Sequence, residues 1–427
     1  MTSVQNHQQQ LSGNRKLKKS YIAYALTLLL GAASCAPKNT VLRAPSSPGT
    51  VTETKPDTDT AENRDKSHAA ESKSERKARS LALLLPFKLD AIGSEGVQEK
   101  DVKRSALALD FYQGFELGVK ELKSNKLDVQ VIDSKDNTYF NSTLAKSEQI
   151  SDVGLIVGPV YPIEIKAFGS NLPDKDKLIV NPLAASPASE FGLSNLVTIT
   201  PSIKTHTKGV ATRAAKDYLN GDIIIIYNTS DNDSRQFLEE MSSEIRKANP
   251  SAKVVSVSSL SQLNDNLSNT GTNMIISGTT DKTNLNNLIS SLSKSASESF
   301  YTIKLFGHPL WDRFDFSNHT YFYNLRPIIT TESSLKNWTS EARNFREMYK
   351  QQYGVFPSDQ SYKGYDIAQY FGKMINKHGM DNLKSKLESE PYTGLYSTYK
   401  FEYNENWGYS NEAVSYKEYI HGAFQIQ

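Results

Sequence analysis

The chain has 427 residues, of which 38% are hydrophobic, and a formal net charge of +2 at pH 7. This composition is typical of a globular protein with a sizeable core, and the near-neutral charge balance gives no electrostatic basis for nucleic-acid binding. The single cysteine, Cys35, excludes intrachain disulfides and cysteine-based zinc sites.

The first 35 residues fall into three parts of different character. A cationic cluster at 15–19 precedes an apolar stretch at 21–30, and small residues at 31–34 lead to Cys35. This order resembles a bacterial lipoprotein signal, in which residues 1–34 are the signal peptide and Cys35 carries the lipid, including palmitate. The apolar stretch is short for a membrane span, which needs ~20 residues. The alternatives are an uncleaved anchor helix and an ordinary secretory signal.

Two residues near the cysteine bear on this interpretation. Ala32 stands where Leu is usual in such signals, and Ala36 follows the cysteine. In enterobacterial lipoproteins, Asp directly after the lipidated cysteine favours retention in the inner membrane. If these sorting rules apply here, Ala36 favours the outer membrane. We therefore expect a cell-envelope protein held by lipid on the periplasmic face. Residues 36–79 are rich in Pro, Ser, Thr and charged side chains, which predicts a disordered tether.

From residue 80 onward, short apolar runs alternate with helical spacing. Continuous apolar runs of this length are typical of strands buried on both faces of a parallel sheet. A first series of strands is predicted at 81–87, 128–133, 154–158, 177–182 and 196–200. A second series, with helices at 205–219, 234–248 and 284–292, has strands at 223–227, 253–257, 273–278 and 302–307. Two successive β-α series predict an α/β protein with two Rossmann-like lobes.

The C-terminal third is predicted to complete both lobes. Helices are expected at 335–353 and 362–378, followed by short antiparallel strands at 396–424. Lobe one is expected to contain about 80–201 with part of 355–427, and lobe two about 202–325 with part of 326–427. The chain would cross between the lobes near Pro201-Ser202, near 323–330 and near 354–360.

Several of these segments together resemble the type I periplasmic binding proteins, in the branch of leucine/isoleucine/valine-type solute-binding proteins. The matching pieces span nearly all of the folded region and lie at 83–87, 110–118, 158–160, 181–186, 345–354, 364–368 and 392–394. Lipoprotein activators of penicillin-binding proteins share this fold and a similar layout. The resemblance implies two lobes that close on a ligand held in the cleft between them.

In lobe one, the cleft candidates follow the third and fourth strands. Gly158 and Tyr161 lie in the first loop, where family amino-acid binders have a Ser that receives the ligand carboxylate; here Tyr161-Pro162 leaves that role unfilled. Tyr161 contacts the ligand or packs in the core. Ala184 and Ser186 lie in the second loop, and Ser186 either binds the ligand or caps a helix.

In lobe two, the candidates follow three strands. Asn228 and Thr279 come after the strands at 223–227 and 273–278, and the alternative is that both are turn or N-cap residues. Trp311 follows the strand at 302–307 and is either an aromatic lid over the cleft or a core residue.

The sequence contains no motif that indicates catalysis. Gly-x-Ser-x-Gly, the Walker A loop and His-Glu-x-x-His are all absent, and the histidines of the folded region at 206, 308, 319, 378 and 421 lack metal-ligand spacing. His308, beside Trp311 and Asp312, is the one pairing of interest. We predict no enzyme, metal or cofactor.

Two functions compete on this basis. The first is a receptor that binds a small amino-acid-like or peptide-like ligand, serving a transporter. The second is an activator or scaffold that binds a peptidoglycan synthase and has a vestigial cleft. The sequence does not separate them.

Overall fold

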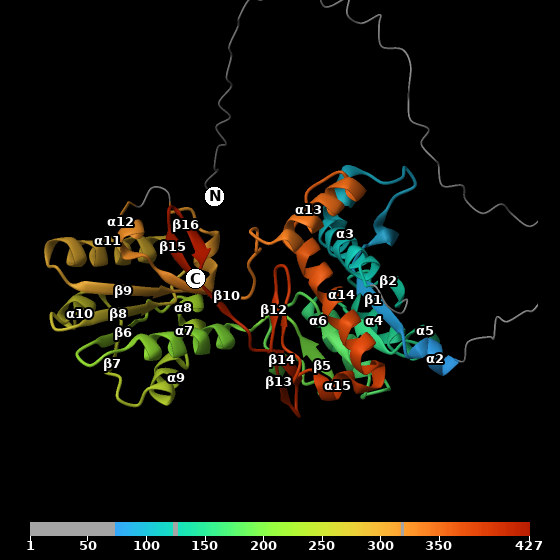
Figure 1. Ribbon diagram of the computed structural model, residues 1–427, viewed down its shortest axis with the longest axis horizontal. Coiled ribbons are helices and arrows are strands. Elements are labelled where there is room, and N and C mark those ends of the chain that lie inside the picture. Colours follow the sequence, from blue (N-terminus) through green and yellow to red (C-terminus); the bar gives the residue numbers. More distant parts are fainter. Residues whose placement is uncertain (1–72, 123–126, 317–319) are drawn as a thin grey trace, which may run out of the picture. The chain divides into compact units, whose positions relative to one another are not determined.

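Two seven-stranded sheets organise the chain, and each forms the centre of one lobe (Figure 1). The computed structural model describes residues 73–122, 127–316 and 320–427, which belong to a single compact unit, His68–Gln427. The predicted signal peptide, Cys35 and most of the predicted tether lie outside the described residues. The two Rossmann-like lobes of the α/β fold are confirmed.

The sheet of lobe one has the strand order β13-β14-β5-β4-β3-β1-β2, and its first five strands in the chain run parallel. The strands are β1 (Ser80–Leu85), β2 (Asp128–Asp133), β3 (Leu155–Val157), β4 (Ile179–Asn181), β5 (Leu196–Thr198), β13 (Phe401–Asn404) and β14 (Gly408–Asn411). The last two return from the C-terminal part, and β14 lies parallel to β5.

Helices cover both faces of this sheet. They are α3 (Glu99–Lys120), α4 (Thr138–Leu144), α5 (Glu148–Ser151), α6 (Pro162–Asn171), α13 (Ser340–Tyr353), α14 (Asp359–His378) and α15 (Leu383–Lys386), with short 3-10 turns η1 (Leu89–Ala91), η2 (Ala188–Glu190) and η4 (Met380–Asn382). In β1, Leu83 packs with Phe111 and Phe371 on one face, and Leu84 packs with Phe168 on the other. Burial on both faces explains the continuous apolar run.

Lobe two repeats this plan with the strand order β16-β15-β10-β9-β8-β6-β7. Its strands are β6 (Ile223–Tyr227), β7 (Val254–Val257), β8 (Thr272–Ser277), β9 (Thr302–Gly307), β10 (Ile328–Thr331), β15 (Ser415–Ile420) and β16 (Ala423–Ile426). Its helices are α7 (Ile203–Asp217), α8 (Asn232–Leu238), α9 (Met241–Ala248), α10 (Leu260–Asp265), α11 (Lys282–Glu298), α12 (Thr320–Leu325) and the 3-10 turn η3 (Pro309–Arg313). The helix expected at 234–248 is thus two helices.

The chain crosses between the lobes three times, at 199–202, 332–339 and 412–414. The first crossing was expected at Pro201-Ser202, whereas the other two lie elsewhere. The expected crossing at 323–330 overlaps α12 and β10, and β10 pairs with β9 and β15 within lobe two. The expected crossing at 354–360 connects α13 to α14 inside lobe one, with Gly354 as the left-handed C-cap of α13 at φ 76°.

The end of the predicted tether is also structured. Residues 73–77 form α2 (Lys73–Lys77), and the carbonyl of Arg79 accepts a 3.0 Å hydrogen bond from the backbone N–H of Asp128. The Ser80 hydroxyl donates to the carbonyl of Arg76 at 2.6 Å. These contacts attach the segment to β1 and β2, so the folded unit begins several residues before residue 80.

Candidate functional site

A cavity of about 950 Å³ lies between the lobes, at the carboxyl ends of the parallel strands. Ala185 and Ser186 reach it from the loop after β4, Asp233 from the first turn of α8, and His308 from the loop after β9. The crossing residues Thr200–Pro201 and 332–335 line the cavity as well, together with Thr330 and Thr331 at the end of β10. Open α/β sheets bind ligands at this edge, because loops and helix N-termini converge there.

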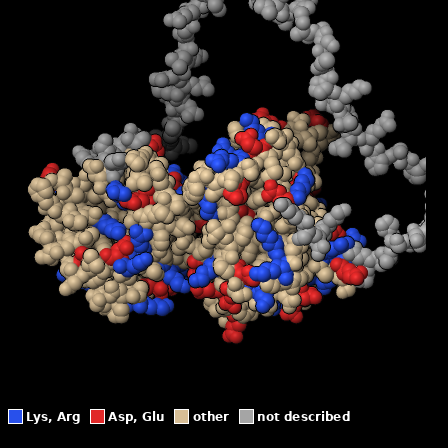
Figure 2. Space-filling view, in the orientation of Figure 1, with Lys and Arg blue, Asp and Glu red and all other residues tan. Residues whose placement is uncertain are grey.

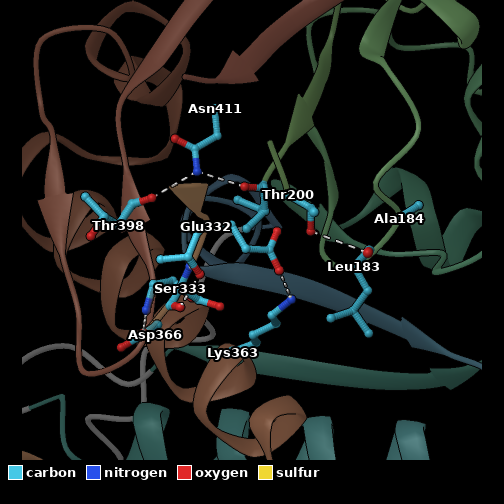
Figure 3. A network of polar contacts seen from close by, with 12 residues as sticks. Leu183, Ala184, Thr200, Glu332, Ser333, Lys363, Asp366, Thr398 and Asn411 are labelled. Atoms are coloured by element: carbon cyan, nitrogen blue, oxygen red, sulfur yellow. Dashed lines mark hydrogen bonds and ion pairs between the residues drawn. The ribbon is translucent and has the colours of Figure 1, made fainter. Parts of the chain in front are cut away.

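The crossing segments are joined by a network of polar contacts (Figure 3). The Asn411 amide donates to the carbonyls of Ile199 at 2.8 Å and Thr398 at 2.9 Å, and its oxygen accepts from the backbone N–H groups of Lys400 and Ala413. Asn411 therefore ties the first crossing to the third.

The second crossing is held against lobe one. Lys363 of α14 forms a 2.7 Å ion pair with Glu332, and Ser333 bridges to Ser397 in the turn between the short strands β11 (Tyr392–Thr393) and β12 (Thr398–Tyr399) (Figure 3). The Asp366 carboxylate accepts three backbone N–H bonds from 395–397 at 2.7 to 2.9 Å, which fixes that turn. The crossing thus has a defined path beside the cavity.

Two buried histidines of lobe two line the cavity. His206, on α7, is 7% exposed, and its Nδ1 lies 3.0 Å from the Thr330 hydroxyl of β10. His308, the N-cap of η3, is 4% exposed, and its Nδ1 accepts a 3.1 Å hydrogen bond from the N–H of Leu310. Both imidazoles are therefore fixed through Nδ1, which leaves Nε2 as the free edge of each ring.

Burial keeps both imidazoles neutral at pH 7. Desolvation lowers the pKa of His206 from 6.5 to about 4, against a smaller opposing effect of Glu332. Desolvation also lowers the pKa of His308 to about 4, with smaller effects from Asp233, His206 and Asp231. Neutral histidines with one occupied nitrogen can donate or accept one further hydrogen bond each.

Charged side chains of both signs surround the cavity. The cations are Lys204, Arg313, Lys363 and Lys417, and the carboxylates are Glu190, Asp233, Glu239, Asp312, Glu332 and Asp359. Lys417 pairs with Asp312 at 2.6 Å, Lys363 pairs with Glu332, and Lys204 pairs with Glu240 at 2.9 Å. Across the outer face shown in Figure 2, Lys/Arg and Asp/Glu side chains are likewise interspersed.

Of the lobe-one residues predicted for the site, Ser186 lines the cavity. Ala184 lies beside it, with its N–H and carbonyl both bonded to the Asn181 side chain at 2.9 Å. Gly158 has φ 101°, and a Cβ there would come 2.1 Å from the carbonyl oxygen of Leu84. Tyr161 is the N-cap residue of α6 and packs against the core of lobe one, as its alternative interpretation held.

The lobe-two residues predicted for the site have structural contacts. The Asn228 oxygen accepts from the N–H of Ser230 at 2.9 Å in a turn after β6. Thr279 is fully buried, and its hydroxyl donates to Asp231 at 2.7 Å. Trp311 is fully buried in the core of lobe two, where its Nε1–H donates to the Thr279 carbonyl at 2.8 Å. The core alternative thus describes the place of Trp311.

His308 stands out in the sequence, but no sequence pattern places it beside His206, 102 residues earlier in the chain. Their proximity depends on the pairing of β9 with β10 and on the packing of α7 against β10 through Thr330. The Lys363–Glu332 pair was also missed. A local signal existed only for His308, which follows a predicted strand directly.

Two features are absent from the part of the chain that the structure describes. Within 73–122, 127–316 and 320–427, no group of three or more His, Cys, Asp or Glu side chains is placed to hold a metal ion. In that same part of the chain, no helix combines the length and apolar character that a membrane crossing requires.

No protein-family model and no curated protein matches this sequence. Solved structures do match its fold. A putative branched-chain amino acid ABC transporter from Rhodospirillum rubrum has a TM-score of 0.57 at 12% identity, covering 82% of this chain and 99% of that one. The LpoA (YraM) C-domain from Haemophilus influenzae, described as a regulator of PBP1A, has a TM-score of 0.52 at 13% identity with the same coverage.

An ABC transporter substrate-binding protein from Desulfitobacterium hafniense has a TM-score of 0.51 at 15% identity, again covering 82% of this chain and 99% of that one. At these identities the likeness concerns the fold. Together with the two seven-stranded sheets and the cavity between them, it shows that this chain has the type I periplasmic binding protein fold.

Proposed function

We propose that this chain is a non-catalytic cell-envelope lipoprotein that binds a small polar ligand, amino-acid-like or peptide-like, between its lobes as the receptor of a transporter. The observation that carries the proposal is the cavity of about 950 Å³ with polar side chains from both lobes. A cavity of this size is within the range of about 300–1,000 Å³ that small-molecule sites occupy.

Ser186 is the predicted lobe-one contact in this proposal, since it lines the same cavity as His206 and His308 of lobe two. The fold supports the proposal because two of the similar structures are a substrate-binding protein and a putative amino acid transporter component. Hinge motion about the three crossings would enclose the ligand.

A ligand panel tests this function. The full chain is screened by thermal unfolding against amino acids, short peptides and muropeptides. A ligand present at about 100 times its dissociation constant adds roughly 2.7 kcal/mol to the unfolding free energy, which appears as a rise in melting temperature. Ser186→Ala should reduce the rise, whereas Ser410→Ala on β14 should leave it unchanged. No response to any ligand in a wide panel would contradict the proposal.

The lipid anchor is a separate part of the proposal. Cys35 follows the small residues of a lipoprotein-like signal, so residues 1–34 would be removed and the lipidated Cys35 would begin a tether to the outer membrane. We expect wild-type protein in the membrane fraction with labelled palmitate, and Cys35→Ala in the soluble or unprocessed fraction without the label. Equal fractionation and labelling of both proteins would contradict lipidation at Cys35.

The second candidate function is that of an activator or scaffold for a peptidoglycan synthase. The observation that favours it is the likeness to the LpoA C-domain over 99% of that chain, together with the packing role of Tyr161 where amino-acid binders hold a carboxylate. Capture of a purified synthase by the wild-type chain and equally by the Ser186→Ala variant, with no ligand response, would favour this function over the first.

A further inference from the structure

Lobe two presents a hydrogen-bonding surface to the cavity that the predicted site did not contain. It consists of His206 and His308, which both line the cavity. Among the described residues, each ring makes one hydrogen bond, and in both cases that bond uses Nδ1. In that part of the chain neither Nε2 has a hydrogen-bond partner, and both side chains line the cavity.

The hydrogen bond at Nδ1 defines the proton position on His308. The backbone N–H of Leu310 donates to Nδ1, so this nitrogen is the acceptor of the ring. In a neutral imidazole the other nitrogen then carries the proton. The Nε2–H of His308 is therefore a donor without a partner in the protein, and a ligand oxygen can accept from it.

The surroundings of the two rings disfavour an anionic ligand group. Carboxylates of Asp233 and Glu332 act on His308 and His206, and both rings are neutral because burial lowers the pKa of each. Of the four cations around the cavity, Lys204, Lys363 and Lys417 already pair with carboxylates. A ligand carboxylate at the rings would meet the neutral Nε2–H donor of His308 and nearby negative charge, and desolvating it there is costly.

We propose that His206 and His308 form a ligand-binding subsite that takes an uncharged oxygen acceptor, such as a hydroxyl or an amide carbonyl, and rejects a carboxylate. This inference rests on the proposed ligand-binding function and names the chemistry of the ligand group that faces lobe two. Nearby carboxylates such as Asp233 accept from donors on the same ligand. The ligand is therefore a polar compound held by hydroxyl or amide groups at this end.

Matched pairs of probes that differ in one charge test the charge preference. We use glucuronamide with glucuronate, and N-acetyl-alanyl-alanine amide with the corresponding acid, each titrated into the full chain by calorimetry. At least one neutral probe should bind, and its acid counterpart should bind at least about tenfold more weakly, as expected for a charge that lacks compensation. Equal or tighter binding of the acids would overturn the proposal, as would binding of none of the four probes.

Asparagine variants test the histidines without removing their structural bonds. Asn reproduces the Nδ1 position of His, so His308→Asn keeps an acceptor for the N–H of Leu310 while it removes the Nε2 donor, and His206→Asn keeps the contact with Thr330. Each variant should lower the affinity for the neutral probe by about fivefold or more, the equivalent of one lost hydrogen bond. His378→Asn, on α14 beside Glu390, is the matched control.

Unchanged affinity in both cavity variants would overturn the proposal. One outcome distinguishes failure of the subsite proposal from failure of the proposed ligand-binding function. If charged amino acids bind and shift the melting temperature while the neutral probes do not, the cleft still binds ligands and only the assignment of the His206–His308 subsite fails.

Discussion

Individual buried titratable groups determine how the folding stability of the protein depends on pH. The pKa of His308 is lowered to about 4 by burial, below its value of 6.5 in an unfolded chain. Between these values the unfolded state binds the proton more readily, so the contribution of His308 to stability falls as pH falls from 6.5 to 4. Burial raises the pKa of Asp366 to about 6, and this group acts in the opposite sense between pH 6 and 3.8.

Because the two effects oppose each other, the stability of the wild type alone does not report on His308. The difference in stability between wild type and a His308 variant isolates the contribution of the histidine. We compare the unfolding free energies of wild type and His308→Asn by denaturant titration from pH 7 to pH 4. As the pH falls from 7 to 4, the wild type should lose about 3 kcal/mol of unfolding free energy relative to the variant. A pH-independent difference would mean that His308 titrates normally in the folded protein.

Asn411 is the residue that joins the crossings most directly. It is 2% exposed, and its side chain bonds four backbone groups on three segments. Asn411→Ala would leave buried donors and acceptors without partners, so we expect a loss of about 3 kcal/mol in unfolding free energy. Asn406→Ala, at an exposed turn, should change it by less than about 0.5 kcal/mol. Similar effects of both substitutions would contradict this role.

Helices α3 and α14 approach each other closely through glycines. Gly114 of α3 faces the backbone of Ser361, and Gly364 of α14 faces the backbone of Phe111. A Cβ at Gly114 would come 1.8 Å from the Ser361 carbonyl oxygen. Contact between two backbones requires both helices to have glycine there, and it fixes the position of α14, which supplies Lys363 to the cavity.

Gly114→Ala tests this contact because two effects predict changes of opposite sign in the unfolding free energy. Helix propensity alone would stabilise α3 by about 1 kcal/mol, whereas the clash with a neighbouring backbone costs about 1–3 kcal/mol or more. We expect net destabilisation, measured by denaturant unfolding. Gly93→Ala, with nothing within 4 Å of its Cβ, is the control and should be neutral. A stabilised Gly114→Ala variant would refute the close packing.

The sequence allowed most strands to be predicted because local composition decides them. The run at 223–227 is apolar throughout and forms β6 as expected. In contrast, β10 has four residues, directly after Pro327, and becomes a strand through pairing with β15, which lies about 90 residues later in the chain. The crossing at 332–339 was misplaced for the same reason, since tertiary pairing rather than local composition defines it.

The site was predicted less well than the fold. Ser186, predicted from its place in a loop after a strand, lines the cavity. However, Tyr161, Thr279 and Trp311 resemble ligand contacts in sequence, although they pack or bond within their own lobes. Whether the side chain of a loop residue faces the cavity or packs inside its lobe depends on its neighbours in space, and a single sequence does not contain that information.

At the scale of the whole molecule, two lobes of the same plan are connected by three short crossings (Figure 1). The cavity draws its lining from both lobes, so a ligand that contacts both sides would stabilise a closed arrangement. The lobes would then move about the crossings at 199–202, 332–339 and 412–414, while the sheets remain unchanged.

Single-molecule energy transfer across the cleft measures whether the two lobes close when a ligand binds. Dyes are placed at Ile163→Cys, on the exposed start of α6, and at Asn232→Cys, on the exposed start of α8, in the Cys35→Ala protein. With a ligand that raises the melting temperature, we expect a shift to a state of higher transfer efficiency. An unchanged efficiency distribution at saturating ligand would contradict closure of the two lobes around the cavity.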